Sequence, residues 1–321
     1  MTRLSVMATN RYSDETRTRR LDPDSFANGY FRNAVYRHWD PYEDILQELL
    51  DQDRERLISR EQTEQQFDVL RRTLALFGAG EEAVTDDLAP LAMAIGDVDK
   101  QLFVISQLYE EAKHAAFFNR YWHEVIDPVA EARGFEVTAP TDPRYFPDAY
   151  VELFDRTERA MDRLLADESP EALAEAFCHY HLVVESVLVQ TGYYSIQSAW
   201  SPTGADMGVD GEPIHLEGLV EGITRIRSDE GRHVGFGMHE VQRLVAEGVD
   251  PAIVEDTLSE LLPLVAGTVE NPASEVDTTA LVEYATEKLG RWIEIITDTN
   301  ADLPPVETIV YVEGGRDVST V

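Results

Sequence analysis

Apolar residues recur every three or four positions along most of the chain, from about residue 42 to about residue 297. This spacing places apolar side chains along one face of a helix, and few stretches show the alternation of a half-buried strand. The sequence therefore predicts an all-α protein with long helices, over residues 42–58, 60–78 continuing into 81–95, 98–127, 147–167, 170–200, 215–247, 250–270 and 277–297.

Polar, proline-rich or glycine-rich segments separate the predicted helices. Residues 1–30 are polar without a clear period and are expected to be extended, 127–148 is a proline-rich connection, and 201–213 is a loop rich in glycine and proline. The last residues alternate apolar and polar positions, which is compatible with a short strand. We expect an N-terminal arm, a helical domain and a C-terminal tail, over residues 1–34, 35–297 and 298–321.

The chain is strongly acidic. Its 321 residues include 61 Asp and Glu against 27 Lys and Arg, a formal net charge of -34. Such an anionic surface repels nucleic acids and anionic membranes, so neither is an expected partner. It suits a salt-rich cytoplasm, where screening limits self-repulsion, and it indicates a halophilic source. The hydrophobic content of 43% still predicts a packed core.

The cysteine content and the absence of long apolar runs indicate a cytoplasmic protein. Cys178 is the only cysteine, so no disulfide framework is expected and a reducing compartment is favoured. The N-terminal residues contain no apolar stretch of signal-peptide length, and no run approaches a membrane span.

Four of the predicted helices each carry one glutamate within an otherwise mostly apolar row. Residues three or four positions apart share a helix face, so Glu81 lies in a row with Phe77 and Val84. The corresponding glutamates on the other helices are Glu111, Glu185 and Glu230. Two of them are followed three positions later by a histidine, namely His114 and His233.

Buried carboxylates need a compensating charge, because an unpaired one is too costly to leave ionised. Two divalent metal ions would neutralise four converging glutamates, and two neutral imidazoles would complete the coordination. One Glu from each of two helices plus Glu-x-x-His from each of two others is the ligand pattern of ferritin-like dimetal carboxylate proteins. A single Glu-x-x-His pair is weak evidence, but the complete order is far more specific. The competing interpretation is surface glutamates with incidental histidines.

Four segments carry a resemblance to a known family: "GEEAVTDDLAPL", "EEAKHAAFF", "YHLVVESVLVQTGYY" and "SDEGRH". They resemble the metal-binding segments of R2-like ligand-binding oxidases, a branch of the ribonucleotide reductase small-subunit superfamily. The resemblance covers roughly residues 35–295. It implies a ferritin-like four-helix-bundle core with additional helices, of the ribonucleotide reductase small-subunit type, and a homodimer.

The resemblance also implies a mixed manganese–iron centre, with manganese in the first site, that reacts with dioxygen. Carboxylate-rich ligands do not by themselves distinguish Mn/Fe from Fe/Fe. Glu81, Glu111 and His114 would form the first site, and carboxylates would bridge to the second site, formed by Glu185, Glu230 and His233.

Two further features are implied by the same resemblance. One is a long-chain fatty acid or similar lipid bound with its carboxylate at the metals. The other is an ether cross-link between Val84 and Tyr180, which occupy the family's positions relative to the first and third glutamates. Tyr180 and Glu185 lie about 140° apart around an ideal helix. Both can face the metals only if their helix contains a π-bulge.

Two residues outside the ligand set are candidates for supporting roles. Asp229 directly precedes Glu230 and is a candidate acceptor for a ligating imidazole, most plausibly that of His114. Trp39, in "RHWDP", resembles the tryptophan of the superfamily's electron-relay chain. The competing interpretations are a solvent-facing acid for Asp229 and a core anchor for Trp39.

Two other functions stay open at this stage. A ribonucleotide reductase small subunit stores a radical for a partner protein and usually has a tyrosine four residues after the first ligating histidine. This chain has Phe118 there. A non-catalytic carrier of metal or lipid is the second alternative, although such a carrier would not need a redox-active metal pair.

Overall fold

The computed structural model describes residues 21–200, 214–269, 286–287 and 290–296. These residues contain helices and connecting segments and no strand, as predicted for an all-α protein. The elements are α2 (Phe26–Tyr36), α3 (Gln47–Ser59), α4 (Glu64–Ala94), α5 (Val98–Tyr121), η1 (Trp122–Ile126), α6 (Asp127–Arg133), η2 (Pro143–Tyr145), α7 (Asp148–Arg163), α8 (Pro170–Phe177), η3 (Cys178–Val189), α9 (Gln190–Trp200), α10 (Glu217–Ala246) and α11 (Pro251–Val269).

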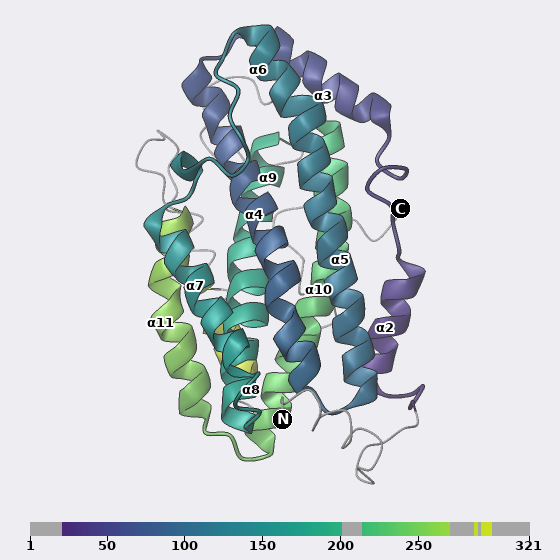
Figure 1. Cartoon of the computed structure of the whole chain (residues 1–321), viewed down its shortest axis with the longest axis vertical. Helices are drawn as coiled ribbons and strands as arrows, with labels where there is room; N and C mark the ends of the chain where they lie inside the picture. Colours follow the sequence, from purple (N-terminus) through teal and green to yellow (C-terminus); the bar gives the residue numbers. More distant parts are fainter. Residues whose placement is uncertain (1–20, 201–213, 270–285, 288–289, 297–321) are drawn as a thin grey trace, which may run out of the picture.

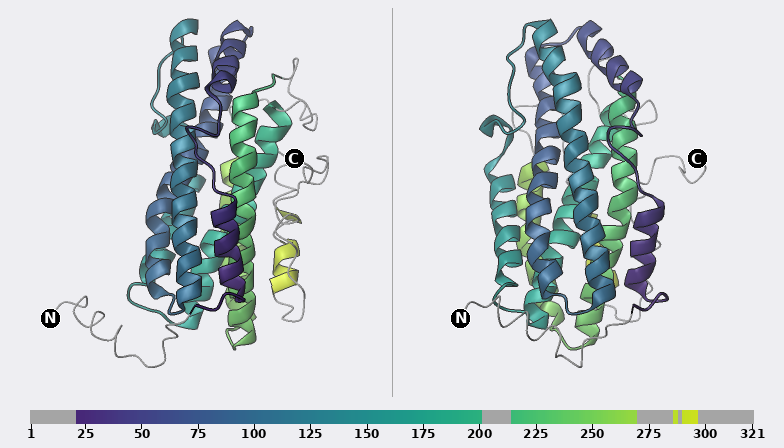
Figure 2. Two further views of the ribbon diagram at one scale, coloured as in Figure 1. Left: turned by 90° about the vertical axis from the view of Figure 1, so that its right-hand side faces the viewer. Right: turned by 45° about the vertical axis from the view of Figure 1, so that its right-hand side comes forward.

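The long helices run side by side as an elongated bundle (Figure 1). Its core consists of α4, α5, α10 and the continuous helical run formed by α8, η3 and α9. Helices α7 and α11 pack against one side of this bundle, and α2 packs against α5 and α10 on the other (Figure 2). The architecture is therefore a four-helix core with additional helices, as the sequence predicted.

A short turn sets the register between α4 and α5. Helix α4 begins at a capping box, in which the Thr63 hydroxyl accepts from the backbone N–H of Gln66 and the Gln66 side chain accepts from that of Thr63. Helix α5 begins at Asp97, whose carboxylate accepts from the N–H of Lys100. The antiparallel helices are joined only by residues 95–97. Glu81 and Glu111 are equally far in sequence from the middle of this turn, so they lie level with each other.

Two apolar clusters fill the bundle, one on each side of a polar layer. One cluster contains Val84, Val104, Val184 and Val234, and the other contains Phe77, Phe117, Tyr193 and Ile226. Each of the four core helices contributes to both clusters. The glutamates predicted as metal ligands fall between these residues on every helix, so the fold places them at one level.

Glycines allow α10 to approach its neighbours closely. A Cβ at Gly237 would lie 2.2 Å from the Cβ of His181, and a Cβ at Gly222 would lie 2.0 Å from the ring of Phe117. Side chains at these positions would push α10 away from η3 and from α5. The glycines therefore help to hold the bundle at the width that its polar layer requires.

Some predicted boundaries were wrong. Residues from Phe26 onward form α2 rather than an extended arm, because Phe26 and Tyr30 pack against the main apolar cluster. Helix α3 begins at Gln47 and not at residue 42, and α6 extends helical structure to Arg133, within the segment predicted as a connection. The loop 201–213, the tail 298–321 and most of the helix predicted at 277–297 lie outside the described residues.

Within the described part of the chain, one helical segment is long and apolar enough to cross a membrane, contrary to the sequence expectation. Pro170–Tyr193 spans 24 residues with a mean hydropathy of 1.3 in its most apolar window. Because 78% of that window is buried inside the protein, the segment has the surroundings of a core helix. It contains Tyr180 and Glu185, which face the polar layer.

Candidate metal centre

The six residues predicted as metal ligands lie together in the polar layer. Glu81 comes from α4, Glu111 and His114 from α5, Glu185 from η3, and Glu230 and His233 from α10. All six side chains are buried, with exposed fractions between 0% and 5%. A charged cluster buried this deeply requires internal compensation.

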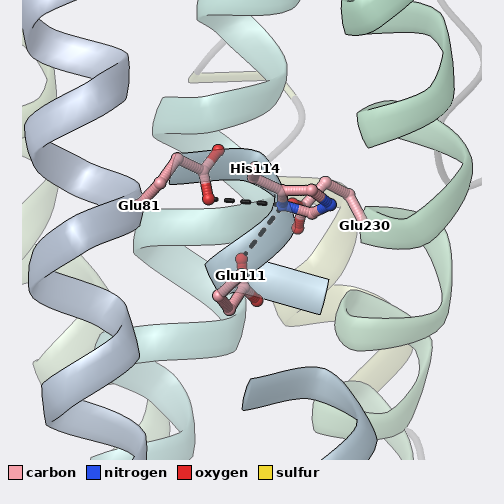
Figure 3. Close-up of side chains that lie close together, drawn as sticks. All are labelled: Glu81, Glu111, His114 and Glu230. Atoms are coloured by element: carbon pink, nitrogen blue, oxygen red, sulfur yellow. Dashed lines mark hydrogen bonds and ion pairs between the residues drawn. The ribbon is translucent and has the colours of Figure 1, made fainter. Parts of the chain in front are cut away.

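The cluster forms two groups, each able to hold a metal ion. The ligand atoms within each group lie within 4.8 Å of one another. Figure 3 shows the first group, with Glu81 on α4 pointing across to the residues of α5 and α10. Glu111 and Glu230 belong to both groups, so they are placed to bridge two ions. Glu81 and His114 complete the first group, and Glu185 and His233 complete the second.

Both imidazoles turn Nδ1 toward the carboxylates. The Nδ1 atom of His114 lies 3.3 Å from Glu81, 3.2 Å from Glu111 and 3.2 Å from Glu230. The Nδ1 atom of His233 lies 3.0 Å from Glu111, 3.3 Å from Glu230 and 3.6 Å from Glu185. Nδ1 of each ring is therefore the nitrogen that, once deprotonated, could bind an ion shared with these carboxylates.

The other nitrogen of each imidazole meets a carboxylate from the opposite helix. Nε2 of His114 on α5 lies 3.2 Å from Asp229 on α10, and Nε2 of His233 on α10 lies 2.9 Å from Glu110 on α5. Arg232, which is 1% exposed, donates to both carboxylates. Such partners fix the tautomer and orientation of ligating histidines. The placement of Asp229 beside His114 is the one expected from sequence.

Sequence reasoning missed Glu110 and Arg232, although a signal for Glu110 was present. Glu110 precedes Glu111 just as Asp229 precedes Glu230, so the two helices repeat an acidic–Glu–x–x–His pattern. A residue one position before a ligand lies on the neighbouring face of the helix, toward the other helix of the pair. The repeat could therefore have predicted the crossed support of both histidines.

Trp39 is buried and linked to the centre through Asp229. Its indole Nε1 donates to Asp229 over 2.8 Å, and its ring stacks on that of His114 with the centroids 6.2 Å apart. The ammonium group of Lys113 also lies 3.1 Å from Asp229 and 4.9 Å from the centre of a Trp39 ring. A hydrogen-bonded path thus connects the Trp39 indole to His114.

The π-helix η3 lets Tyr180 and Glu185 face the same site. The segment Cys178–Val189 is π-helical, which meets the condition stated above for Tyr180 and Glu185 to face the centre together. The Tyr180 hydroxyl donates to Glu111 over 3.1 Å. The Glu185 carboxylate accepts from Gln107 over 2.7 Å, and the Gln107 carbonyl lies 3.2 Å from Nε2 of His181.

Burial and mutual repulsion shift the acid–base equilibria of the protein groups considered alone. Burial raises the pKa of Glu81 to about 8 and raises that of Glu185 well above its usual range. Burial opposes ionisation of Glu111 too, but the neighbouring imidazoles outweigh it and hold its pKa well below normal. Burial disfavours the charged forms of His114 and His233, yet the surrounding carboxylates raise both pKa values. The cluster therefore retains protons that metal ions can replace.

The donor set fits a pair of hard divalent ions. Four carboxylates and two imidazoles suit manganese and iron, and carboxylate ligands tune such ions without selecting one of them strongly. One oxygen of Glu81 and one of Glu185 are buried and have no hydrogen-bond partner among the described residues. Buried carboxylate oxygens without partners are costly, and coordination would satisfy both.

A largely apolar cavity of about 150 Å³ reaches the centre from one side. It lies between α4, α7, η3, α9 and the end of α11. Its polar end is formed by the centre itself, with Tyr180 and Val84 beside the glutamates. Its apolar lining includes Leu76, Phe77, Phe154, Val184, Leu188 and Val269. The cavity can therefore take a long apolar ligand with a polar head at the centre.

The fold and this centre define a ferritin-like dimetal-carboxylate protein of the all-α class. No protein-family model matches the chain. Solved structures do: a Val-to-Leu variant of an R2-like ligand-binding oxidase with anaerobically reconstituted Mn/Fe cofactor matches with a TM-score of 0.72 and 27% sequence identity. The match covers 85% of this chain and 94% of that chain.

Further matches point to the same family. A Glu-to-Asp variant and a Tyr-to-Phe variant, both with aerobically reconstituted Mn/Fe cofactor, match with TM-scores of 0.69 and 0.70 at 27% identity. Each covers 85% of this chain and 94% of the other. In fold and in site, the chain is therefore similar to the R2-like ligand-binding oxidases.

The positions exchanged in those variants have counterparts here. The Glu and Val positions are separated by the same number of residues as Glu81 and Val84. Two of the matching structures are Tyr-to-Phe variants at different positions. These two positions are separated by the same number of residues as Tyr180 and Tyr193. Tyr193 is buried, stacks on Phe77 and has a hydroxyl without a partner among the described residues.

Proposed function

We propose that this protein is an oxygen-dependent oxidoreductase that uses a dinuclear Mn/Fe centre. The observation that carries the proposal is the pair of buried ligand groups sharing Glu111 and Glu230, in the fold of named Mn/Fe oxidases. The first ion would be held by Glu81, Glu111 and His114, and the second by Glu185, Glu230 and His233. When bound, the two ions supply the activation of dioxygen. Fe/Fe occupancy is the alternative, since the ligand types accept either metal.

Other groups of the protein would orient the ligands, exclude water and connect the centre to Trp39. Asp229 and Glu110 would hold the imidazoles in orientation, and Arg232, which donates to both carboxylates, would hold these two in place. The surrounding aromatic and aliphatic side chains exclude water from the centre, which protects a reactive oxidant. Trp39 is placed to carry electrons toward His114 through Asp229.

We further propose that the cavity binds a long-chain fatty acid or similar lipid. Its lining is largely apolar, and its polar end is the metal centre. A carboxylate head would be attracted to the ions, and burial of the chain would contribute roughly 0.8 kcal/mol per methylene group. The neighbouring oxidases are named as ligand-binding, which agrees with this assignment.

The bond we expect this centre to form is an ether link between Val84 and Tyr180. Both residues line the cavity beside the centre, and burial together with Glu111 raises the pKa of Tyr180, so its phenol stays protonated. The link joins the phenol oxygen to a carbon of Val84. One hydrogen atom leaves each residue, and dioxygen accepts the two electrons and two protons.

We also propose that the protein forms a homodimer and resides in a reducing cytoplasm. Exposed apolar side chains of α2 and α5 offer a surface that a second copy could cover, including Val35, Tyr36, Ile105 and Tyr109. The single described cysteine, Cys178, is buried and free, which suits a reducing compartment.

Peptide mass mapping after loading with Mn(II) and Fe(II) tests the proposed chemistry. After exposure to air, the peptide containing Val84 should be joined to that containing Tyr180, with the loss of two hydrogen atoms. An anaerobic sample and a Tyr180→Phe variant should show separate peptides with unchanged metal content. If the air-exposed wild-type peptides also stay separate, the oxidase proposal fails for this bond.

That outcome would favour one of two other functions. A ribonucleotide reductase small subunit normally places a radical tyrosine where this chain has Phe118, whose buried ring stacks on Phe77. A carrier would bind metal or lipid without consuming dioxygen. Oxygen uptake by the loaded protein separates the carrier from both redox functions.

A further inference from the structure

A second pocket lies on the surface of the bundle, away from the metal centre. It is formed by α7, α8, the start of η3 and α11, which lie side by side in Figure 1. Arg156, Arg159 and Arg163 line it from α7. Because they are spaced three and four residues apart, the three guanidinium groups lie on one face of that helix.

The guanidinium groups keep donors free for a ligand. Among the residues that the structure describes, Arg156 uses only its Nε atom, which donates to Glu152 over 2.6 Å. Arg159 makes one loose contact, at 3.8 Å, to the same carboxylate. Arg163 is the more fully paired of the three, to Asp167 and Glu175. Exposed pairs of this kind contribute little to stability, so they compete weakly with a ligand.

His179 closes the inner end of the pocket. Its side chain is 8% exposed, and its buried Nδ1 atom has no hydrogen-bond partner among the described residues. Burial, reinforced by Arg156 and Arg159, lowers the pKa of His179 to about 4. The two arginines therefore lie close enough to repel a charged imidazole. A buried imidazole nitrogen without a partner, beside guanidinium groups that keep donors in excess of their carboxylate contacts, is the surrounding expected of an anion site.

The pocket gathers three of the chain's arginines in one place. Its lining also includes two carboxylates, Glu175 and Glu260, and Glu152 and Asp167 pair with the arginines from outside the lining. Planar guanidinium groups recognise oxyanions through paired hydrogen bonds. The net charge of -34 repels anionic lipid bilayers, which favours a soluble ligand.

We propose that this pocket binds a soluble small molecule bearing a phosphate group, such as a phosphate monoester or a diphosphate. Arg156 and Arg159 supply the free guanidinium donors, Arg163 extends the site along α7, and His179 offers a further hydrogen bond at its inner end. None of these residues is a proposed metal ligand. The phosphate-binding proposal can therefore fail without affecting the proposed oxidase activity.

Calorimetric titration of the metal-loaded full-length protein with inorganic phosphate and with diphosphate tests the proposal. Ionic strength is held constant with chloride. We expect saturable binding of at least one of these ions, weakened about tenfold or more in an R156Q/R159Q double variant. The His179→Gln variant should weaken binding by a smaller factor. Thermal unfolding confirms that each variant is folded.

Arg144→Gln is the matched control. Arg144 is also an exposed arginine paired with two carboxylates, Glu136 and Asp142, but it lines no part of this pocket. Its substitution should change binding by less than about twofold. Absence of saturable binding, or equal weakening in the control and double variants, overturns the proposal. Arginine-dependent binding seen only with phosphatidic acid vesicles overturns the assignment of a soluble ligand.

Discussion

The two sides of the metal centre are built differently. On the side of α5 and α10, every charged group has partners: Asp229 meets His114, Trp39, Lys113 and Arg232, and Glu110 meets His233 and Arg232. On the side of α4 and η3, Glu81 and Glu185 each keep an oxygen without a partner and border an apolar cavity.

This contrast distinguishes the groups that orient the metal ligands from the groups that exchange protons for metal ions. Burial opposes ionisation of Asp229, but His114, Arg232 and Lys113 outweigh it and lower its pKa. Burial raises the pKa of Glu81 to about 8, without comparable compensation. One side therefore holds fixed charges that orient ligands. The other side holds carboxylates that can exchange protons for metal and faces the space where a ligand would enter.

Removing a shared glutamate should have the largest effect. Glu230 belongs to both ligand groups, so Glu230→Ala should abolish binding of both ions rather than one. Elemental analysis of the purified, loaded protein measures this directly. Glu82→Ala is the control, because Glu82 neighbours Glu81 but is exposed. Retention of one full ion by Glu230→Ala would contradict the bridging role.

Removing the buried arginine between α5 and α10 should have the second largest effect, on the free energy of unfolding. Arg232→Met leaves Asp229 and Glu110 buried without their shared cation, which should lower the free energy of unfolding by about 3 kcal/mol or more. Arg225→Met, which removes a partly exposed pair with Glu221, should cost less than about 1 kcal/mol. Urea unfolding of both variants makes the comparison. Equal losses of unfolding free energy in the two variants would show that Arg232 contributes no more to stability than a partly exposed arginine.

The cavity side should show a distinct pH dependence in chelator-treated protein. Folding raises the pKa of Glu81, so its protonated form is favoured in the folded state. Its contribution to stability is therefore complete below the pKa of the unfolded chain and is lost as pH rises through about 8. The shift of the Glu81 pKa from 4.5 to about 8 corresponds to a complete loss of the order of 5 kcal/mol.

Urea unfolding between about pH 6 and about pH 9 measures this contribution. The Glu81→Gln variant should show a shallower decline than the wild type, because it has no proton to lose at that position. Metal loading should release protons and weaken the decline, since ions replace the protons. Parallel pH profiles for the variant and the wild type would rule out Glu81 as the titrating group.

Narrowing the cavity should have the smallest effect on fold and metal content. Leu188 lines the cavity, so Leu188→Trp should reduce the amount of lipid that copurifies with the protein while leaving both ions bound. Leu165→Trp is the control, because Leu165 is 41% exposed and lies outside the cavity. Mass spectrometry of extracted ligand gives the readout. Unchanged lipid in Leu188→Trp would argue against the cavity as its site.

The fold and the ligand cluster followed closely from sequence, because both depend on local spacing. Apolar rows of helical period fix which face of each helix is buried, and Glu111 and His114 share a face for the same reason. The π-helix was predictable only because Tyr180 and Glu185 were both expected at the site. Helix α2 was missed because its burial depends on contacts of Phe26 and Tyr30 with distant helices.

The hydrogen-bonded side and the cavity were harder to predict. Arg232 looks like any helical arginine in the sequence, and only the packing of α5 against α10 places it between two carboxylates. The cavity is lined by residues of seven separate elements, including the distant end of α11. Such features depend on how whole helices meet, which spacing within one helix does not specify.

Anomalous X-ray diffraction at the manganese and iron edges, from crystals of the loaded protein, tests the central claim most directly. We expect two anomalous peaks. One should lie among Glu81, Glu111, His114 and Glu230, and the other among Glu111, Glu185, Glu230 and His233. Manganese should occupy the first position and iron the second. A single peak, or peaks away from these residues, would contradict the dinuclear centre on which the proposed function rests.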